Sequence, residues 1–115
     1  TDDLVWFGNG GNGGIISTAD ELLTTMQAIV SGRLLPEELV SEMKQPNQQS
    51  YGLGLGTVRL SCGTFYGHEG AVNGTASIAI VSPDGADGVV IALNLRSGDD
   101  PGLPALADRM LCAGR

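Results

Sequence analysis

Apolar residues in the first third of the chain recur with the spacing of helices. Residues 18–31 form the first predicted helix, and either Ser17 or Thr18 suits its N-cap. The apolar stripe of this helix comprises Leu22, Met26, Ile29 and Val30. A second helix is predicted over residues 36–44, where Pro36 fits the first turn. Its buried stripe comprises Leu39, Val40 and Met43.

After residue 50 the period of the pattern shortens to that of strands. Four strands are predicted, at residues 51–60, 64–68, 75–82 and 89–95. Turn residues separate them, namely Cys62-Gly63, Asn73-Gly74 and Pro83-Asp84-Gly85. Such short connections predict an antiparallel meander. Residues 89–93 are apolar at every position, so both faces of the last strand should be covered by helices, one of them a closing helix over residues 101–112.

Composition places these elements in one α+β domain, an antiparallel sheet flanked by helices, that spans residues 1–115. The chain has 115 residues, of which 42% are hydrophobic, which is enough for a core. A net charge of −7, with six Lys and Arg residues spread along the chain, argues against nucleic acid as a partner. No apolar run is long enough to span a membrane. Thr1-Asp2-Asp3 does not resemble a signal peptide, so we expect a mature product or a piece of a longer protein.

Cys62 and Cys112 are the only cysteines. In an exported protein they would form a disulfide that closes a long loop, which stabilises the fold by roughly 4 kcal/mol in the chain-entropy model. The alternative is a pair of buried thiols in a cytosolic protein. Two cysteines do not make a structural zinc site, which needs about four ligands, and we predict no metal.

A glycine-rich run near the N-terminus resembles a nucleotide-binding fingerprint in its letters. Residues 8–13 satisfy G-x-G-x-x-G, which binds phosphates only where a helix opens directly after the glycines. Here Ile15-Ile16-Ser17 separates the glycines from the first predicted helix, and the strands that follow are of the antiparallel type. We therefore interpret the run as a flexible loop and predict no cofactor.

The segment from Tyr66 to Gly74 contains the candidate chemistry. His68, the only histidine, lies between glycines at the end of a predicted strand. Because Gly70 has no Cβ, a bound molecule can approach the main-chain N–H groups here, and the charge of an imidazole is adjustable near neutral pH. The alternative is a histidine that serves packing alone.

Several motifs together resemble a known enzyme family. They are the run Gly13-Gly14-Ile15-Ile16-Ser17-Thr18-Ala19-Asp20-Glu21-Leu22, then Ser31-Gly32-Arg33-Leu34-Leu35-Pro36, Tyr51-Gly52-Leu53-Gly54-Leu55 and Gly67-His68-Glu69-Gly70. In this order they are similar to landmarks of serine β-lactamases and penicillin-binding proteins, in particular the class C β-lactamases and the D-alanyl-D-alanine carboxypeptidases. The resemblance covers nearly the whole chain, but only the C-terminal portion of such an enzyme.

The resemblance implies a role for each residue of the strand motif. In that family the motif reads Lys or His, then Ser or Thr, then Gly, and it lines the active site. His68 and Gly70 match the first and third positions, and Ala71 would donate its backbone N–H to an oxyanion hole. Glu69 and Asn73 are then the candidate substrate-binding residues. The resemblance also implies a secreted, periplasmic or cell-envelope location and a small-molecule or peptide substrate.

Two departures from the family pattern modify these expectations. Glu69 stands where the family carries a hydroxyl, and its charge would repel a substrate carboxylate, which favours amide or ester substrates that lack a carboxylate or bear an amine. The family nucleophile, Ser-x-x-Lys, opens a buried helix, whereas Ser41-Glu42-Met43-Lys44 ends one. Neither Tyr51 nor Tyr66 begins a Tyr-x-Asn motif.

We therefore expect a fragment of a serine hydrolase that is inactive alone and needs the N-terminal portion of the same enzyme. In its absence, a bare sheet edge would favour self-association. The alternative hypothesis is a non-catalytic module that binds a cell wall or a peptide through the same strand.

Overall fold

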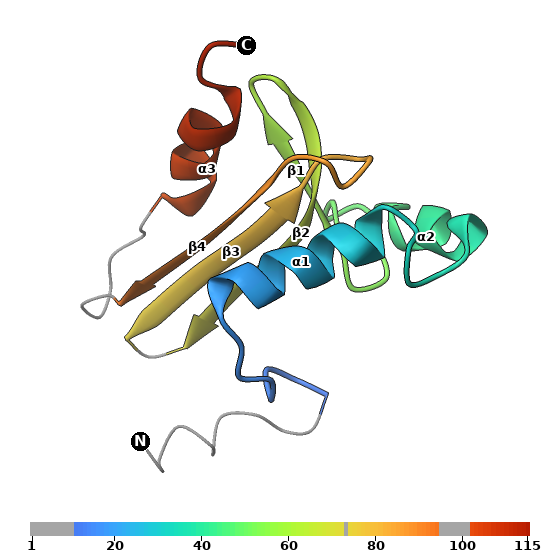
Figure 1. The fold of residues 1–115 in the computed structure, drawn as a ribbon, viewed down its shortest axis with the longest axis horizontal. Coiled ribbons are helices and arrows are strands. Elements are labelled where there is room, and N and C mark those ends of the chain that lie inside the picture. Colours follow the sequence, from blue (N-terminus) through green and yellow to red (C-terminus); the bar gives the residue numbers. More distant parts are fainter. Residues whose placement is uncertain (1–10, 73, 95–101) are drawn as a thin grey trace.

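The computed structural model describes residues 11–72, 74–94 and 102–115 (Figure 1). The described elements follow the chain in the order α1 (Ala19–Val30), α2 (Glu37–Met43), β1 (Gly56–Leu60), β2 (Gly63–Val72), β3 (Thr75–Val81), β4 (Gly88–Asn94) and α3 (Leu103–Cys112). This order confirms the predicted α+β class. Residues 1–10, which include residues 8–10 of the glycine-rich run, lie outside the described residues, as does Asn73.

Helix α1 begins where the sequence predicts, because Thr18 caps it. The hydroxyl of Thr18 accepts a hydrogen bond from the N–H of Glu21, and the Glu21 carboxylate accepts one from the N–H of Thr18. These bonds hold the pKa of Glu21 below its usual value. Because α1 begins at Ala19, no helix starts directly after Gly13, as a phosphate-binding fingerprint would require. This agrees with the interpretation of the glycine run as a loop.

The strands form one sheet in the order β1-β2-β3-β4, and each neighbouring pair is antiparallel. The predicted meander is therefore confirmed, although two strand limits were wrong. The first strand begins at Gly56 rather than residue 51, because the N–H of Gly52 bonds to the carbonyl of Leu55 and closes a turn there. The second strand runs to Val72 rather than His68, because its far half pairs fully with β3.

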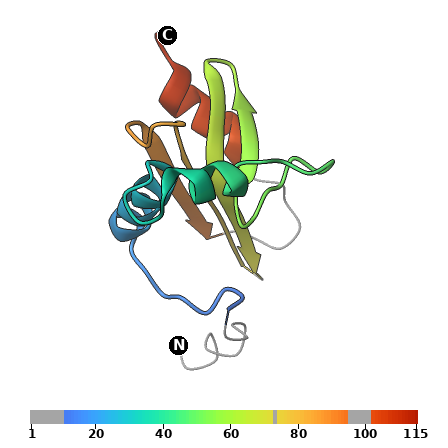
Figure 2. The same ribbon diagram turned by 90° about the vertical axis from the view of Figure 1, so that its right-hand side faces the viewer.

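Two hydrophobic clusters lie on opposite faces of this sheet. On one face, α3 covers the cluster of Phe65, Ala76, Ile78, Ile80, Val89, Ile91, Leu103 and Ala107. On the other face, α1 covers the cluster of Met26, Val30, Leu55, Ala79 and Val81. Figure 2 shows α1 standing to one side of the strands. Side chains of β3 alternate between the two clusters, as expected for a strand buried on both faces.

The turn between β1 and β2 is tied to α3 by two kinds of bond. Cys62 and Cys112 form a disulfide across 50 residues, which confirms the predicted disulfide. Beside it, the Asp108 carboxylate accepts hydrogen bonds from the N–H and the hydroxyl of Ser61, the latter at 3.0 Å. Helix α3 is therefore held against the hairpin as well as packed on the sheet.

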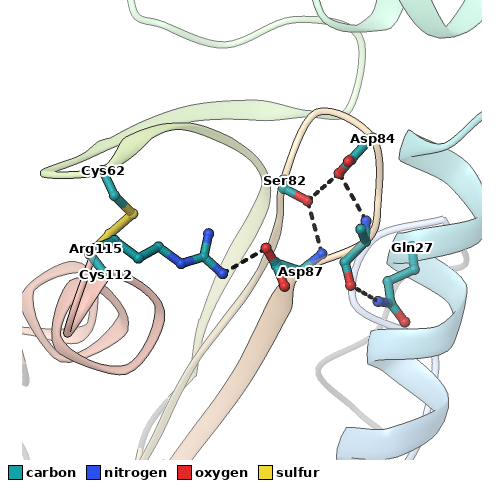
Figure 3. A network of polar contacts seen from close by, with 8 residues as sticks. Gln27, Cys62, Ser82, Asp84, Asp87, Cys112 and Arg115 are labelled. Atoms are coloured by element: carbon teal, nitrogen blue, oxygen red, sulfur yellow. Dashed lines mark hydrogen bonds and ion pairs between the residues drawn. A yellow bond between two sulfur atoms is a disulfide. The ribbon is translucent and has the colours of Figure 1, made fainter.

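Polar contacts close the turn between β3 and β4 in the same way (Figure 3). The Asp84 carboxylate accepts from the hydroxyl of Ser82 at 2.6 Å and from the N–H of Ala86 at 3.0 Å. These two hydrogen bonds, the first above all, lower the pKa of Asp84. The side-chain amide of Gln27 in α1 donates to the Ala86 carbonyl at 3.3 Å, so the turn also contacts α1.

Across the described part of the chain, no helix is long and apolar enough to cross a membrane.

Among the glycines of β2, Gly67 has the least room for a side chain. A Cβ at this position would lie 1.8 Å from the carbonyl oxygen of Ala79, which is backbone and does not move easily. We expect Gly67→Ala to lower the free energy of unfolding by about 3 kcal/mol in urea titrations with the disulfide intact. Gly11→Ala is the control, because a Cβ there meets nothing within 4 Å. Equal stability of the two variants would contradict this packing.

Candidate functional site

Strand β2 extends well beyond its neighbour β1. β1 pairs with β2 only from Gly63 to Gly67, whereas β3 pairs with β2 from Tyr66 to Val72. The stretch from His68 to Val72 therefore has a strand on one side only, and its described residues are exposed. We call this stretch the open edge of β2. It contains His68, Glu69, Gly70 and Ala71, the candidate residues from the sequence.

The direction of each main-chain amide in the open edge follows from the ladder. The N–H of Thr57 donates to the Ser50 carbonyl at 2.8 Å, on the side of β1 away from β2. The N–H and C=O groups of its neighbour Gly56 therefore point toward β2. Those of Gly67, the partner of Gly56, point toward β1. Because this direction alternates along a strand, the N–H groups of Glu69 and Ala71 point away from β3, into the open side. Ladder pairing with β3 does not occupy them.

Gly70 lies between these two residues, and its own N–H and C=O groups point toward β3. A Cβ at this position would lie 2.9 Å from the Ser77 hydroxyl. At this position the backbone itself carries no side-chain atoms. A molecule lying along the open edge can reach the main chain here.

His68 is held by two hydrogen bonds. Its Nε2 atom lies 2.8 Å from the hydroxyl oxygen of Tyr51, and its Nδ1 atom contacts the carbonyl oxygen of Glu69. The rings of Tyr51 and His68 meet edge to face, with centroids 5.6 Å apart. The carbonyl of Glu69 is free to accept this bond because it points into the open side, like the N–H of the same residue.

Tyr51 was not assigned to the site from the sequence, because a tyrosine 17 residues before His68 gives no signal of contact. A compact loop positions it. The side-chain oxygen of Asn47 accepts from the N–H groups of Gln49 and Tyr51, and the N–H of Asn47 donates to the Tyr51 carbonyl at 2.9 Å. Ser50 adopts a positive φ of 59°, which is uncommon for a residue other than glycine.

Two pockets flank the open edge. One has a volume of about 340 Å³ and is lined by Glu69, Gly70, Ala71, Ala76, Ser77, Leu103 and Pro104. The other, of about 300 Å³, is lined by the loop of Tyr51 and by Gly67, His68 and Glu69. Glu69 borders both pockets. Its carboxylate makes no hydrogen bond or ion pair with any described residue, so the charge is available to a ligand.

The Ser41 and Lys44 pair lies in a different pocket, of about 460 Å³, between α1, α2 and the β3–β4 turn. The ammonium group of Lys44 donates to the carbonyls of Val30 and Pro83, both at 3.0 Å. Burial lowers the pKa of Lys44, while the charges of Asp84 and Glu37 act in the opposite direction. The lysine thus joins helix α1 to the β3–β4 turn.

We found no group of three or more His, Cys, Asp or Glu side chains that could hold a metal ion within residues 11–72, 74–94 and 102–115. At the open edge, the described groups are main-chain donors, one imidazole, one phenol and one carboxylate. Such a set can bind an oxyanion, move a proton and attract a cation.

Amide hydrogen exchange tests the direction of the amides in the open edge. The N–H groups of His68 and Gly70 face β3 and should exchange slowly, whereas those of Glu69 and Ala71 should exchange roughly tenfold faster or more. Two-dimensional NMR spectra after transfer to D₂O measure the four rates separately. Slow exchange at Ala71 in the monomer would show that the edge is covered and would exclude a ligand there.

No family model matches the sequence of this chain. Among solved structures, the chain is similar to a D-stereospecific amidohydrolase from a Streptomyces species, with a TM-score of 0.68 and 34% sequence identity. The similarity covers 77% of this chain and 28% of that protein, so the chain spans less than a third of the length of the amidohydrolase. The chain is therefore related in fold and in sequence to part of a hydrolase of the β-lactamase-like type that its motifs resemble.

Proposed function

We propose that this chain supplies one wall of the active site of a serine hydrolase, which cleaves an amide, ester or β-lactam through an acyl-enzyme. The observation that carries the proposal is the open edge of β2, where a His-x-Gly motif lies beside main-chain N–H groups that the sheet does not use. Similarity to an amidohydrolase supports the same reaction class.

Ala71 donates the main-chain N–H of the oxyanion hole. Attack on a carbonyl carbon moves negative charge onto its oxygen, and a fixed N–H directed at that oxygen stabilises the transition state. The N–H of Ala71 points into the open side and is held rigid by the pairing of Gly70 with Ser77 and Val72 with Thr75. Gly70 allows the substrate to lie close to this strand.

Glu69 selects the substrate by charge. Glu69 lines both pockets, and its carboxylate has no cation among the described residues. A substrate carboxylate at this position would be repelled, whereas an ammonium group would be attracted. Amides or esters that bear an amine are therefore the favoured substrates, and penicillins and peptides with a free C-terminal carboxylate are disfavoured. Asn73, which lies outside the described residues, is proposed to contact the same substrate.

The nucleophilic serine comes from outside these 115 residues. Ser41 cannot be activated by Lys44, whose ammonium group is bonded to two carbonyls. In the proposed enzyme, another portion of the same protein adds the Ser-x-x-Lys segment and covers the exposed sheet edges. Without it the chain is inactive and its edges favour self-association, which the amide exchange spectra would show as slower exchange of Ala71 at higher protein concentration.

A binding module without catalysis is the second candidate. Two outward N–H groups and the glycine between them also suit an extended peptide that adds to the edge as a strand. The absence of an activated nucleophile from the described residues favours this candidate. For either function, the disulfide between Cys62 and Cys112 supports a location outside the cytoplasm.

Covalent labelling separates the two candidates. We expect a fluorophosphonate or a fluorescent D-amino acid ester to label the protein that contains this chain together with its Ser-x-x-Lys segment, and not residues 1–115 alone. Ala71→Pro removes one outward N–H without breaking the β2–β3 ladder, and it should slow acylation about 10²–10³-fold. Val72→Ala, which keeps every N–H, is the control. Unchanged acylation in Ala71→Pro would remove Ala71 from the oxyanion hole.

Substrate preference tests the role of Glu69. In paired substrates that differ only in an ammonium or a carboxylate group, Glu69→Gln should shift the ratio of kcat/KM toward the carboxylate by on the order of tenfold, measured at low ionic strength. The matched variant Glu69→Asp retains the charge and should retain the preference. If Glu69→Gln leaves the ratio unchanged, the carboxylate does not select the substrate.

A further inference from the structure

The pairing of Tyr51 with His68 has a consequence for the imidazole. A carbonyl oxygen can only accept a hydrogen bond, so the contact between Nδ1 of His68 and the Glu69 carbonyl requires a hydrogen on Nδ1. In a neutral imidazole, Nε2 is then without a hydrogen and accepts one from the Tyr51 hydroxyl, whose oxygen lies 2.8 Å away. Both contacts thus favour the same tautomer.

The phenol can hold this position because its own backbone is fixed. Asn47 accepts from the N–H of Tyr51, and Tyr51 also forms a bridge with Gly56 at the start of β1. Gly56 in turn pairs with Gly67, the neighbour of His68 in β2. A short series of backbone contacts therefore connects Tyr51 with β2, the strand of His68. The two side chains form their hydrogen bond beside these contacts.

We propose that Tyr51, together with the Glu69 carbonyl, holds His68 in the Nδ1–H tautomer and passes a substrate proton on to Nε2. This role rests on the proposed function for its use in catalysis, but the tautomer itself does not. The substrate donates a proton to the phenol oxygen, and the phenol donates its own hydrogen to Nε2. The phenol is restored, and the imidazolium formed keeps its Nδ1–H on Glu69.

The site is open to solvent where this step would occur. Tyr51 is 39% exposed, and it lines the same pocket of about 300 Å³ as His68 and Glu69. A substrate bound along the open edge of β2 therefore has access to the phenol. The sequence motif alone assigns the proton chemistry to His68, whereas the structure adds Tyr51 as its partner.

The tautomer can be measured directly, because His68 is the only histidine. Long-range ¹H–¹⁵N NMR spectra of the 115-residue chain report which ring nitrogen carries the hydrogen. We expect mainly Nδ1–H in the parent chain. Tyr51→Phe keeps the ring and removes the hydroxyl, and it should lower the ratio of Nδ1–H to Nε2–H roughly fivefold, as the loss of one ordinary hydrogen bond predicts.

Two further variants separate positioning from general destabilisation. Tyr66→Phe removes the hydroxyl of the only other tyrosine, which makes no hydrogen bond with His68, and should leave the ratio unchanged. Asn47→Ala should lower the ratio, because the loop of Tyr51 loses its acceptor, and Asn47→Asp should restore it. Amide spectra of each variant establish that the sheet is folded. An unchanged ratio in folded Tyr51→Phe would overturn the proposal.

Catalysis is tested separately in the protein that carries the nucleophile. There Tyr51→Phe should lower kcat for acylation at least roughly tenfold with little change in KM, because proton movement and not binding is impaired. A tautomer shift without any acylation of the parent protein would refute the serine hydrolase while the pairing stands. Normal kcat in Tyr51→Phe, in a protein that is acylated, would refute the role of Tyr51 in the reaction.

Discussion

The pairing of Gly56 with Gly67 is the constraint on which the site depends. It is the last contact between β1 and β2, and beyond it β2 continues with β3 on one side alone. Because peptide groups alternate along a strand, the same register sets which amides face outward. Moving the pairing by one residue would turn the N–H groups of Glu69 and Ala71 toward β3 and would expose those of His68 and Gly70 instead.

The rest of the fold holds this register in place. Gly67 sits so close to Ala79 that no side chain fits between β2 and β3, and α1 and α3 press the sheet from opposite faces. At the far end of the hairpin, the disulfide and the bonds between Ser61 and Asp108 fix the turn to α3. Rigid support of this kind is what a main-chain oxyanion donor needs, since its effect relies on direction before the reaction begins.

The groups along the open edge act as a set. The carbonyl of Glu69 contacts the imidazole, Glu69 lines both neighbouring pockets, and the phenol of Tyr51 completes the contacts of His68. The outward-facing carbonyl of Glu69 accepts from the histidine, whereas the outward-facing N–H groups of Glu69 and Ala71 are not used by the β2–β3 ladder. These groups are unpaired by the ladder because the motif lies where β2 has a neighbouring strand on one side only.

The sequence by itself determined the elements and their order. Helical spacing, a Thr cap and Asn-Gly or Pro-Asp-Gly turns depend on neighbours a few residues apart, so α1, α2, the meander and α3 could be predicted from them. The motif from His68 to Ala71 was visible for the same reason. The extents of β1 and β2 were not, because the end of a strand depends on its partner. Only the tertiary structure decided that β2 outruns β1, that Tyr51 meets His68 and that Lys44 serves the scaffold, since contacts across 14 to 39 residues leave no local pattern in the chain.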